Sequence, residues 1–233
     1  MMMRKNEAVI LAGGFGTRLR TVVHDLPKAM APINGRPFLE YQLDYLIANS
    51  FTKAVLAIGY KGNMIQTHFG SSYKTLKLEY SAEDRPLGTG GALAKAMGMI
   101  ERERFFALNG DTFFGAPLTS LEPEKTWVLG AQVDNVSRYG CLELAADNQV
   151  IKIWEKKKTG PGVVNSGVYR ISKKDLQPFT AQDSWSLEDL LLPRLIDRGE
   201  LFCRVSGEPF IDIGIPQDYE AAQLLIENTS KNL

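Results

Sequence analysis

The segment of this sequence best suited to chemistry is a glycine-rich turn with an arginine directly behind it. Gly13, Gly14 and Gly16 follow an apolar run, and Thr17 and Arg18 complete the segment LAGGFGTRL at residues 11–19. Glycines let backbone N–H groups approach a polyphosphate closely, and an arginine adds a bidentate phosphate donor. The segment is not a Walker A loop, because no Gly-Lys-Ser/Thr follows it, and it lacks the third glycine of the dinucleotide fingerprint. A tight turn alone would account for the glycines, but the adjacent arginine favours phosphate binding.

A lysine held between two prolines comes shortly after this turn. Lys28 lies in the segment LPKAMAP at residues 26–32. The fixed φ angles of the prolines restrict where its ammonium group can point. Most isolated lysines only solvate a surface, but a preorganised cation next to a glycine-rich turn favours a phosphate-binding role.

Two aspartates could serve as metal ligands. Asp111 follows the strand-like run 105–108, at the carboxyl end where open α/β sheets bind their ligands. Asp212 lies between Ile211 and Ile213, and an unpaired carboxylate in such an apolar context is costly unless it meets a cation or several donors. Mg²⁺ would satisfy both residues. The alternative is structural, with Asp111 capping a turn or helix and Asp212 capping the helix that opens at Pro216.

Alternating strand and helix patterns place these residues in an α/β fold. Short apolar runs are followed by helical patterns in the first half, which predicts a mostly parallel sheet. After Asp111 the strand-like runs follow one another closely, which indicates an antiparallel or mixed portion. The predicted strands are 8–12, 54–58, 76–80, 105–108, 127–133, 141–144, 150–154, 163–169, 201–205 and 210–213, and the predicted helices are 38–49, 92–100, one from 187 that ends or kinks near Pro193, and one from Pro216.

Composition limits the class of protein. The 233 residues, of which 44% are hydrophobic, suit a single domain over residues 1–233. The 27 basic and 27 acidic residues cancel, so no global field attracts nucleic acid or an anionic membrane. Cys141 and Cys203 lack the spacing of a zinc or redox site, and the apolar run at 8–12 is too short for a signal peptide or membrane span. We therefore expect a cytoplasmic protein, and the sequence leaves a homo-oligomer open.

Seven short motifs follow one another in a fixed order over nearly the whole chain. They are LAGGFGTRL, PKAM, PLGTGG, NGD, EK, VNSGVY and IDIG. This ordered set resembles the sugar-1-phosphate nucleotidyltransferase family. Within that family, the segments 26–35, 108–114 and 210–216 are similar to those of guanylyltransferases that act on D-glycero-α-D-manno-heptose 1-phosphate.

The resemblance implies a Rossmann-like, mixed but mostly parallel sheet flanked by helices, similar to the glycosyltransferase-A fold. It implies that residues 1–115 bind the NTP and residues 116–233 the sugar phosphate. It also implies that Arg18, Lys28 and Asp111 are catalytic and that Asp111 and Asp212 hold Mg²⁺. The implied nucleotide-binding residues are Leu11, Gly13, Gly14, Gly16, Thr17, Glu83, Pro86, Gly88 and Thr89.

The resemblance makes the segment 83–91 the base-binding loop, whose glycines would let a flat purine lie against backbone. Guanine presents adjacent N1–H and N2–H donors, which one carboxylate can accept together, so Glu83 is the candidate for reading guanine. A solvated loop carboxylate, or an acceptor for the single N3–H of uracil, remains open.

The implied sugar-phosphate site lies further along the chain. A period of two over residues 163–169 puts Asn165, Gly167 and Tyr169 on one partly open face. The resemblance implies that Glu155 and Asn165 hold sugar hydroxyls and that Lys156 holds the sugar phosphate. It adds Gly140 as a backbone contact.

The implied reaction is attack of a sugar 1-phosphate oxygen on the α-phosphorus of GTP, giving GDP-heptose and pyrophosphate. Because the attacking oxygen is already ionised, no general base is required. Mannose-1-phosphate guanylyltransferase and other sugar-1-phosphate uridylyl- or thymidylyltransferases are the enzymatic alternatives. A non-catalytic nucleotide-sugar sensor is a third alternative, which the complete set of cationic and acidic residues disfavours.

Overall fold

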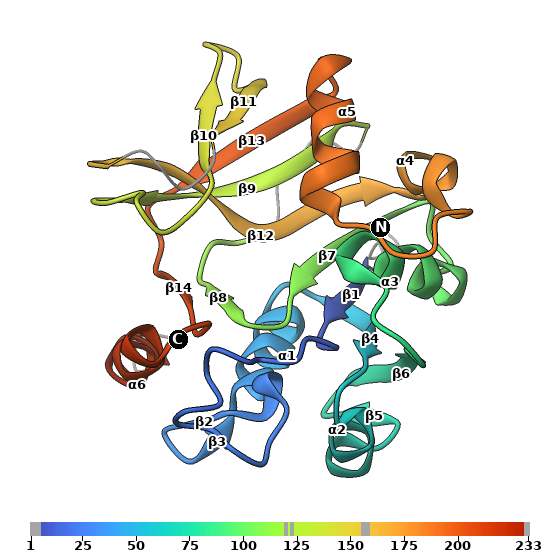
Figure 1. Cartoon of the computed structure of the whole chain (residues 1–233), viewed down its shortest axis with the longest axis vertical. Helices are drawn as coiled ribbons and strands as arrows, with labels where there is room; N and C mark the ends of the chain where they lie inside the picture. Colours follow the sequence, from blue (N-terminus) through green and yellow to red (C-terminus); the bar gives the residue numbers. More distant parts are fainter. Residues whose placement is uncertain (1–5, 119–120, 122–123, 155–158, 231–233) are drawn as a thin grey trace.

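The computed structural model describes residues 6–118, 121, 124–154 and 159–230 of the chain, with side chains up to residue 227 (Figure 1). A ten-stranded mixed sheet runs through the molecule in the order β11-β10-β12-β7-β1-β4-β6-β5, with β9 beside β12 and β13 beside β9. The strands of this sheet are β1 (Asn6–Leu11), β4 (Phe51–Ile58), β5 (Ser72–Tyr73), β6 (Leu76–Ala82), β7 (Arg104–Asn109), β9 (Thr126–Val133), β10 (Cys141–Leu144), β11 (Val150–Trp154), β12 (Gly162–Ser172) and β13 (Leu201–Ser206). Two small sheets pair β2 (Pro32–Ile33) with β3 (Arg36–Pro37) and β8 (Thr112–Phe114) with β14 (Phe210–Asp212).

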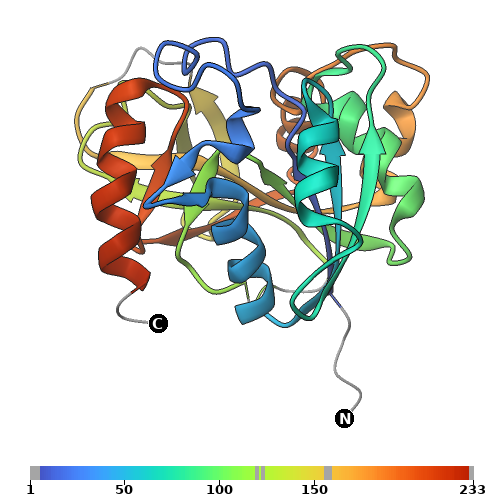
Figure 2. The ribbon, with the colours of Figure 1, turned by 90° about the horizontal axis from the view of Figure 1, so that it is seen from below.

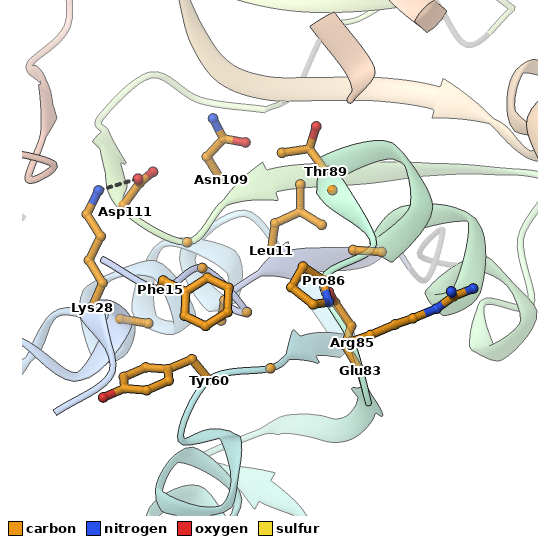
Figure 3. A pocket seen from close by; sticks show the side chains of 18 of the residues that line it. Leu11, Phe15, Lys28, Tyr60, Glu83, Arg85, Pro86, Thr89, Asn109 and Asp111 are labelled. Atoms are coloured by element: carbon orange, nitrogen blue, oxygen red, sulfur yellow. Dashed lines mark hydrogen bonds and ion pairs between the residues drawn. The ribbon is translucent and has the colours of Figure 1, made fainter. Parts of the chain in front are cut away.

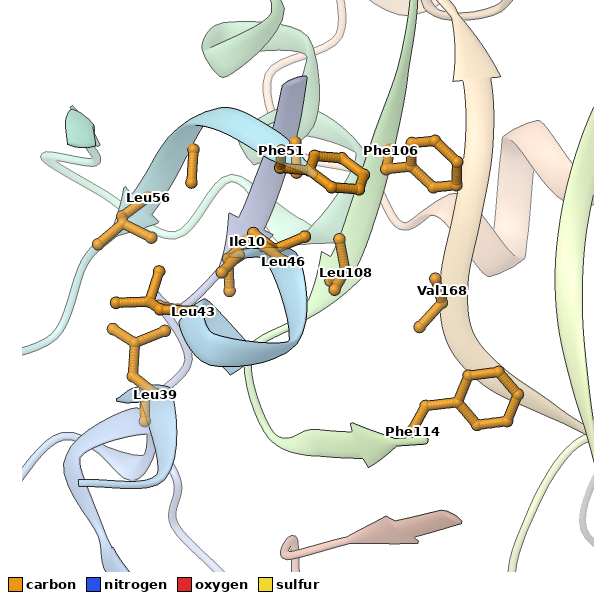
Figure 4. Close-up of a cluster of buried hydrophobic side chains, with 14 of the residues drawn as sticks. Ile10, Leu39, Leu43, Leu46, Phe51, Leu56, Phe106, Leu108, Phe114 and Val168 are labelled. Atoms are coloured by element: carbon orange, nitrogen blue, oxygen red, sulfur yellow. The ribbon is translucent and has the colours of Figure 1, made fainter. Parts of the chain in front are cut away.

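Helices cover both faces of the parallel part of the sheet. Strands β7, β1, β4 and β6 are parallel neighbours. Alternate side chains of β1 enter opposite cores. Ile10 belongs to the core that includes residues of α1 (Phe38–Ala48) and α2 (Gly62–Phe69), and Val9 to the core that includes residues of α3 (Gly88–Ala96) and α5 (Leu192–Asp197). Figure 4 shows the first of these cores, where Leu43 and Leu46 of α1 lie against Ile10 and Leu108. Burial on both faces explains the almost continuous apolar runs of β1, β4 and β7, whereas β6 alternates between buried and exposed residues.

The second half of the sheet is largely antiparallel, as predicted. Strand β12 pairs antiparallel with β7, β9 and β10, and β13 adds a parallel edge to β9. The register of β12 against β9 shifts between Asn165 and Tyr169, and Gly167 within this bulge has a φ of +73°. The bulge lies where β12 leaves β10 and becomes the neighbour of β7 (Figure 1).

The C-terminal helix α6 (Pro216–Ser230) packs beside the β2–β3 hairpin (Figure 2). The Asn34 backbone N–H and side chain bond to Gln223, and the Tyr219 hydroxyl donates to the Pro32 carbonyl at 2.5 Å. Ala222 and Ile226 complete a third core below this contact. The helix therefore connects the segment after Lys28 with the segment after Asp212.

The predicted strands and the mixed α/β class are confirmed. No local pattern predicted α2, which has only eight residues, or the short strand β8. The predicted helix at 92–100 begins earlier, at Gly88, and changes to a 3-10 turn over Met97–Met99. None of the helices in the described ranges is both long and apolar enough to span a bilayer.

Candidate active site

A pocket of about 550 Å³ lies at the carboxyl ends of β1 and β7 (Figure 3). One side is formed by the glycine-rich turn after β1, another by the loop before α3, and a third by the segment after β7. Its lining residues are Leu11, Ala12, Gly13, Gly14, Phe15, Lys28, Ala29, Gly59, Tyr60, Glu83, Asp84, Arg85, Pro86, Gly88, Thr89, Ala92, Asn109, Gly110 and Asp111. The pocket therefore lies where open α/β sheets bind their ligands.

Close backbone packing fixes the glycine-rich turn. The Tyr60 N–H donates to the Gly13 carbonyl at 3.3 Å, and a Cβ on Gly59 would lie 2.8 Å from that carbonyl oxygen. Gly16 has a φ of +59°, and a Cβ there would lie 3.0 Å from the Cβ of Lys28. A larger residue at position 16 would displace the lysine, so the turn and Lys28 form one unit.

Lys28 and two aspartates form a charged cluster at one end of the pocket. Lys28 follows Pro27 in a 3-10 turn over Lys28–Met30, and its ammonium group donates to Asp111 Oδ2. The same Nζ lies 3.6 Å from Asp212 Oδ1. Asp212 reaches the cluster because β14 pairs with β8 and the Ile213 N–H donates to the Asp111 carbonyl at 2.9 Å.

The two carboxylates are under-neutralised by the one lysine. Burial raises the pKa of Asp212, and the negative charge of Asp111 raises it further, while Lys28, the Gly214 N–H and Arg18 act in the opposite direction. The Gly214 N–H donates to Asp212 Oδ1 at 2.5 Å. A further cation between the carboxylates would relieve this repulsion, and carboxylate oxygens are ligands that Mg²⁺ prefers. Two carboxylates fit Mg²⁺, which binds one or two protein carboxylates and completes its shell with water and phosphate oxygens.

Glu83, in the loop before α3, is one of the acidic residues that line the pocket. Glu83 Oε2 accepts a hydrogen bond from the Leu87 N–H at 3.1 Å, and burial raises the pKa of Glu83. Oε1 faces the glycine-rich turn, 3.1 Å from where a Cβ of Gly13 would be. One carboxylate oxygen is therefore anchored to backbone, and the other is directed to the turn that lines the pocket.

Two glycines of this loop pack closely against Trp185. A Cβ on Gly90 would lie 2.1 Å from Cε3 of Trp185, and a Cβ on Gly88 would lie 2.3 Å from the Trp185 carbonyl oxygen. The glycines make room for Trp185 on the first turn of α3, and Gly90 itself does not line the pocket. Gly88 does line the pocket, and contact between this loop and a purine stays a prediction.

Of the predicted sugar-phosphate residues, Gly140 lies directly before β10 and Asn165 lies in β12. The Asn165 N–H donates to the Gly140 carbonyl at 3.2 Å, so these two positions are neighbours. The Asn165 side chain donates to the Tyr169 hydroxyl at 2.8 Å. Tyr169 is buried rather than part of an open face, because the bulge interrupts the alternation of the strand. Glu155 and Lys156 lie outside the described residues.

Comparison with known proteins decides the family. The sequence pattern described as Nucleotidyl transferase matches residues 7–229. The chain belongs to the nucleotidyl transferase family. It is 38% identical over 224 residues to D-glycero-alpha-D-manno-heptose 1-phosphate guanylyltransferase of Aneurinibacillus thermoaerophilus, covering 93% of this chain and 96% of that protein. It is 36% identical over 215 residues to the enzyme of the same name from Campylobacter jejuni, covering 91% and 96%.

A solved structure extends this similarity to three dimensions. HddC from Yersinia pseudotuberculosis superposes on this nucleotidyltransferase with a TM-score of 0.85 at 37% sequence identity, covering 94% of this chain and 98% of that one. The same protein complexed with GMP-PN superposes with a TM-score of 0.84.

Most of the predicted nucleotide and catalytic residues of this nucleotidyltransferase meet in one place. Those that line the pocket are Leu11, Gly13, Gly14, Lys28, Glu83, Pro86, Gly88, Thr89 and Asp111. Gly16 and Asp212 contact Lys28 from outside the lining, and Thr17 and Arg18 are exposed on the turn that follows. Gly140 and Asn165 are not lining residues.

Several lining residues of this nucleotidyltransferase were missed. Phe15 is 49% exposed, and its ring lies 5.7 Å from that of Tyr60 at the pocket wall (Figure 3). Asn109 lines the pocket, and its buried Oδ1 has no hydrogen-bond partner. Its place directly before Gly110 and Asp111 was a usable signal, whereas nothing local links Tyr60 to the glycine-rich turn.

Proposed function

We propose that this nucleotidyltransferase transfers GMP from GTP to D-glycero-α-D-manno-heptose 1-phosphate and releases pyrophosphate. The observation that carries the proposal is the cluster of Lys28, Asp111 and Asp212 at the end of a pocket lined by the glycine-rich turn. A pocket that only bound a nucleotide would have less need for two carboxylates and a lysine at the phosphate end. The cluster therefore supports an enzyme over a sensor.

The relatives support the choice of base and sugar. Two of them, both named as guanylyltransferases of this heptose 1-phosphate, match over 96% of their own length. A mannose-1-phosphate guanylyltransferase from Mycobacterium tuberculosis is 30% identical, and the chain spans only 64% of it. Glu83, with one carboxylate oxygen directed to the glycine-rich turn, supports guanine because it can accept from N1–H and N2–H together. Each feature agrees with GTP and heptose 1-phosphate as the pair of substrates.

The cations would hold the reacting phosphates in line. An ionised oxygen of the sugar 1-phosphate forms a bond to the α-phosphorus, and the bond from that phosphorus to the bridging oxygen of the pyrophosphate breaks. The backbone N–H groups of Gly13, Gly14, Gly16 and Thr17 would cradle the triphosphate. Arg18 and Lys28 would offset charge on the α-phosphate and the departing pyrophosphate, so catalysis is positioning and electrostatics.

Asp111 and Asp212 would hold one Mg²⁺. A bound divalent cation supplies charge neutralisation and orientation to crowded phosphates. The raised pKa of Asp212, caused by burial and by the charge of Asp111, supports this role because a cation is what the pair lacks. The two aspartates thus serve as the protein's share of the ligand set.

The two halves of the chain would divide the substrates. Residues 1–115 would bind GTP, and residues 116–233 would bind the sugar phosphate through Gly140, Glu155, Lys156 and Asn165. The free thiols of Cys141 and Cys203 suit a reducing cytoplasm. We place the reaction there.

Pyrophosphate release tests the proposal. The purified protein with Mg²⁺ is given each of GTP, ATP, UTP, CTP and dTTP with heptose, mannose or glucose 1-phosphate. We expect the highest kcat/KM for GTP with the heptose 1-phosphate. Preference for another pair of substrates would refute the assignment of the base or of the sugar. Release of pyrophosphate from no pair would refute the proposed catalytic activity.

A further inference from the structure

A chain of hydrogen bonds joins the bulge of β12 to the loop that lines the nucleotide pocket. Asn165 Nδ2 donates to the Tyr169 hydroxyl at 2.8 Å, and this hydroxyl donates to Glu188 Oε1 at 3.4 Å. Thr89 lines the pocket, and its Oγ1 donates to Glu188 Oε2 at 3.0 Å. The chain of hydrogen bonds therefore begins at Asn165, on the side assigned to the sugar phosphate, and ends at Thr89 on the first turn of α3.

Burial fixes the direction of the bonds at Tyr169. Its side chain is 1% exposed, so its hydroxyl proton needs a partner inside the protein. The carboxylate of Glu188 can only accept, so the hydroxyl donates to it and accepts from Asn165. This turns the Asn165 amide nitrogen toward Tyr169 and its oxygen toward the Gly167 N–H, at 2.9 Å. Glu188 thus determines, through Tyr169, which atoms Asn165 can offer to a ligand.

The Glu188 end of this chain of hydrogen bonds is tied to the loop before α3, which lines the pocket. The Trp185 N–H donates to the Leu87 carbonyl at 2.9 Å, and the Gly90 N–H donates to the Trp185 carbonyl at 3.0 Å. The Leu187 N–H donates to Thr89 Oγ1 at 2.9 Å. Residues 185–188 are therefore bonded to the loop before α3 through both backbone and side chain. Leu187–Leu191 is a π-helical turn, a conformation that occurs frequently at functional sites.

We propose that Tyr169 and Glu188 are positioning residues that couple the two substrate sites. This inference rests on the proposed function, because it assigns Thr89 to the nucleotide and Asn165 to the sugar phosphate. A nucleotide that contacts Thr89 restricts Glu188, which restricts Tyr169 and Asn165 before the acceptor arrives. The acceptor then has fewer side chains to order, so it binds more tightly. By linkage, the acceptor strengthens nucleotide binding by the same factor.

Calorimetric titration measures this coupling directly. The dissociation constant of heptose 1-phosphate is measured with Mg²⁺, in the absence and in the presence of a saturating non-hydrolysable GTP analogue. We expect the analogue to tighten binding about fivefold or more in the wild-type protein, which is the lower end for coupled sites. Tyr169→Phe keeps the shape of the side chain and removes the hydroxyl. Glu188→Gln also keeps the shape, and it leaves one acceptor oxygen in place of the two that now accept from Tyr169 and Thr89, so the chain of hydrogen bonds is broken at one of them. We expect both to reduce the factor to about one- to twofold.

A matched variant separates coupling from general damage. Tyr45→Phe removes another hydroxyl, which donates to the Ala116 carbonyl away from the pocket. It should keep the wild-type coupling factor even if its melting temperature falls as far as that of Tyr169→Phe. If Tyr169→Phe does not fold, Glu188→Gln on the exposed turn still decides the matter.

The outcomes separate this inference from the proposed function. Wild-type coupling that persists in both variants would overturn the role of Tyr169 and Glu188. A wild-type protein that binds both ligands and turns over, but without coupling, would overturn this inference and leave the proposed function standing. Failure to bind either ligand would refute the proposed function, and the coupling with it.

Discussion

Replacing Glu83 with glutamine should reverse the polarity of the atoms that meet the base. The Leu87 N–H needs an acceptor, so the new amide oxygen takes that bond and the amide nitrogen replaces Oε1. The NH₂ group then faces the N1–H and N2–H donors of guanine. Hydrogen bonds to charged groups contribute about 1.5–3 kcal/mol each. A net loss of about 3 kcal/mol corresponds to a roughly 100-fold lower kcat/KM for GTP.

The same change should leave the fold intact. Burial raises the pKa of Glu83, so the folded protein binds this proton more tightly than the unfolded chain does. The corresponding stability is present below the unfolded pKa and is lost as pH rises through the folded pKa. A neutral glutamine avoids this loss, so Glu83→Gln should melt no lower than the wild type at pH 8. GTP binding by the wild type should weaken on acidification at a higher pH than for an exposed glutamate.

Steady-state kinetics with GTP and ATP, together with thermal unfolding, check this prediction. Glu200→Gln removes an exposed carboxylate far along the chain and serves as the matched control. A Glu83→Gln enzyme that keeps its GTP preference would refute the assignment of Glu83 to guanine. A fall in both activity and melting temperature would indicate a structural role instead.

Three other substitutions test separate parts of the structure. Lys28→Met should lower kcat roughly 10²- to 10³-fold in pyrophosphate release, because the cation at the reacting phosphates is lost; a change in KM alone would contradict this. Lys53→Met leaves Glu7 buried without its cation, 3.7 Å away, and should cost about 3 kcal/mol, or roughly 6–12 °C in melting temperature; unchanged melting would contradict it. Gly167→Ala should lower GTP affinity as well as heptose 1-phosphate affinity, since φ is +73° and the new Cβ would lie 2.4 Å from Nδ2 of Asn109, which lines the pocket; unchanged GTP affinity measured by calorimetry would contradict it.

Local pattern was enough to predict most of the strands and to place the residues that follow β1 and β7 at one edge of the sheet. The apolar runs of β1 and β7 are buried on both faces, and the residues that follow them must meet at the carboxyl edge of the sheet. That geometry brings Gly13 and Asp111 together without further information. The resemblance to a known family then connected Asp212, which lies far along the chain, to the same site.

Other features depend on contacts that no local pattern contains. The packing of Gly90 against Trp185 could not be predicted, because Trp185 lies far along the chain. Tyr60 becomes a pocket residue only because Gly59 packs against Gly13. Tyr169 was placed on an open face because a period of two does not reveal the bulge that begins at Asn165. Tertiary packing and an irregular register decided each of these positions.

We propose that the protein joins GMP to a sugar 1-phosphate through the cluster around Asp111. The most direct measurement is ³¹P NMR of the reaction of GTP with D-glycero-α-D-manno-heptose 1-phosphate and Mg²⁺, for the wild type and for Asp111→Asn. For the wild type we expect the two coupled resonances of a GDP-sugar together with pyrophosphate. For a folded Asp111→Asn variant we expect unchanged substrates. Wild-type protein that leaves both substrates unchanged, or an Asp111→Asn variant that forms the product at the wild-type rate, would contradict it.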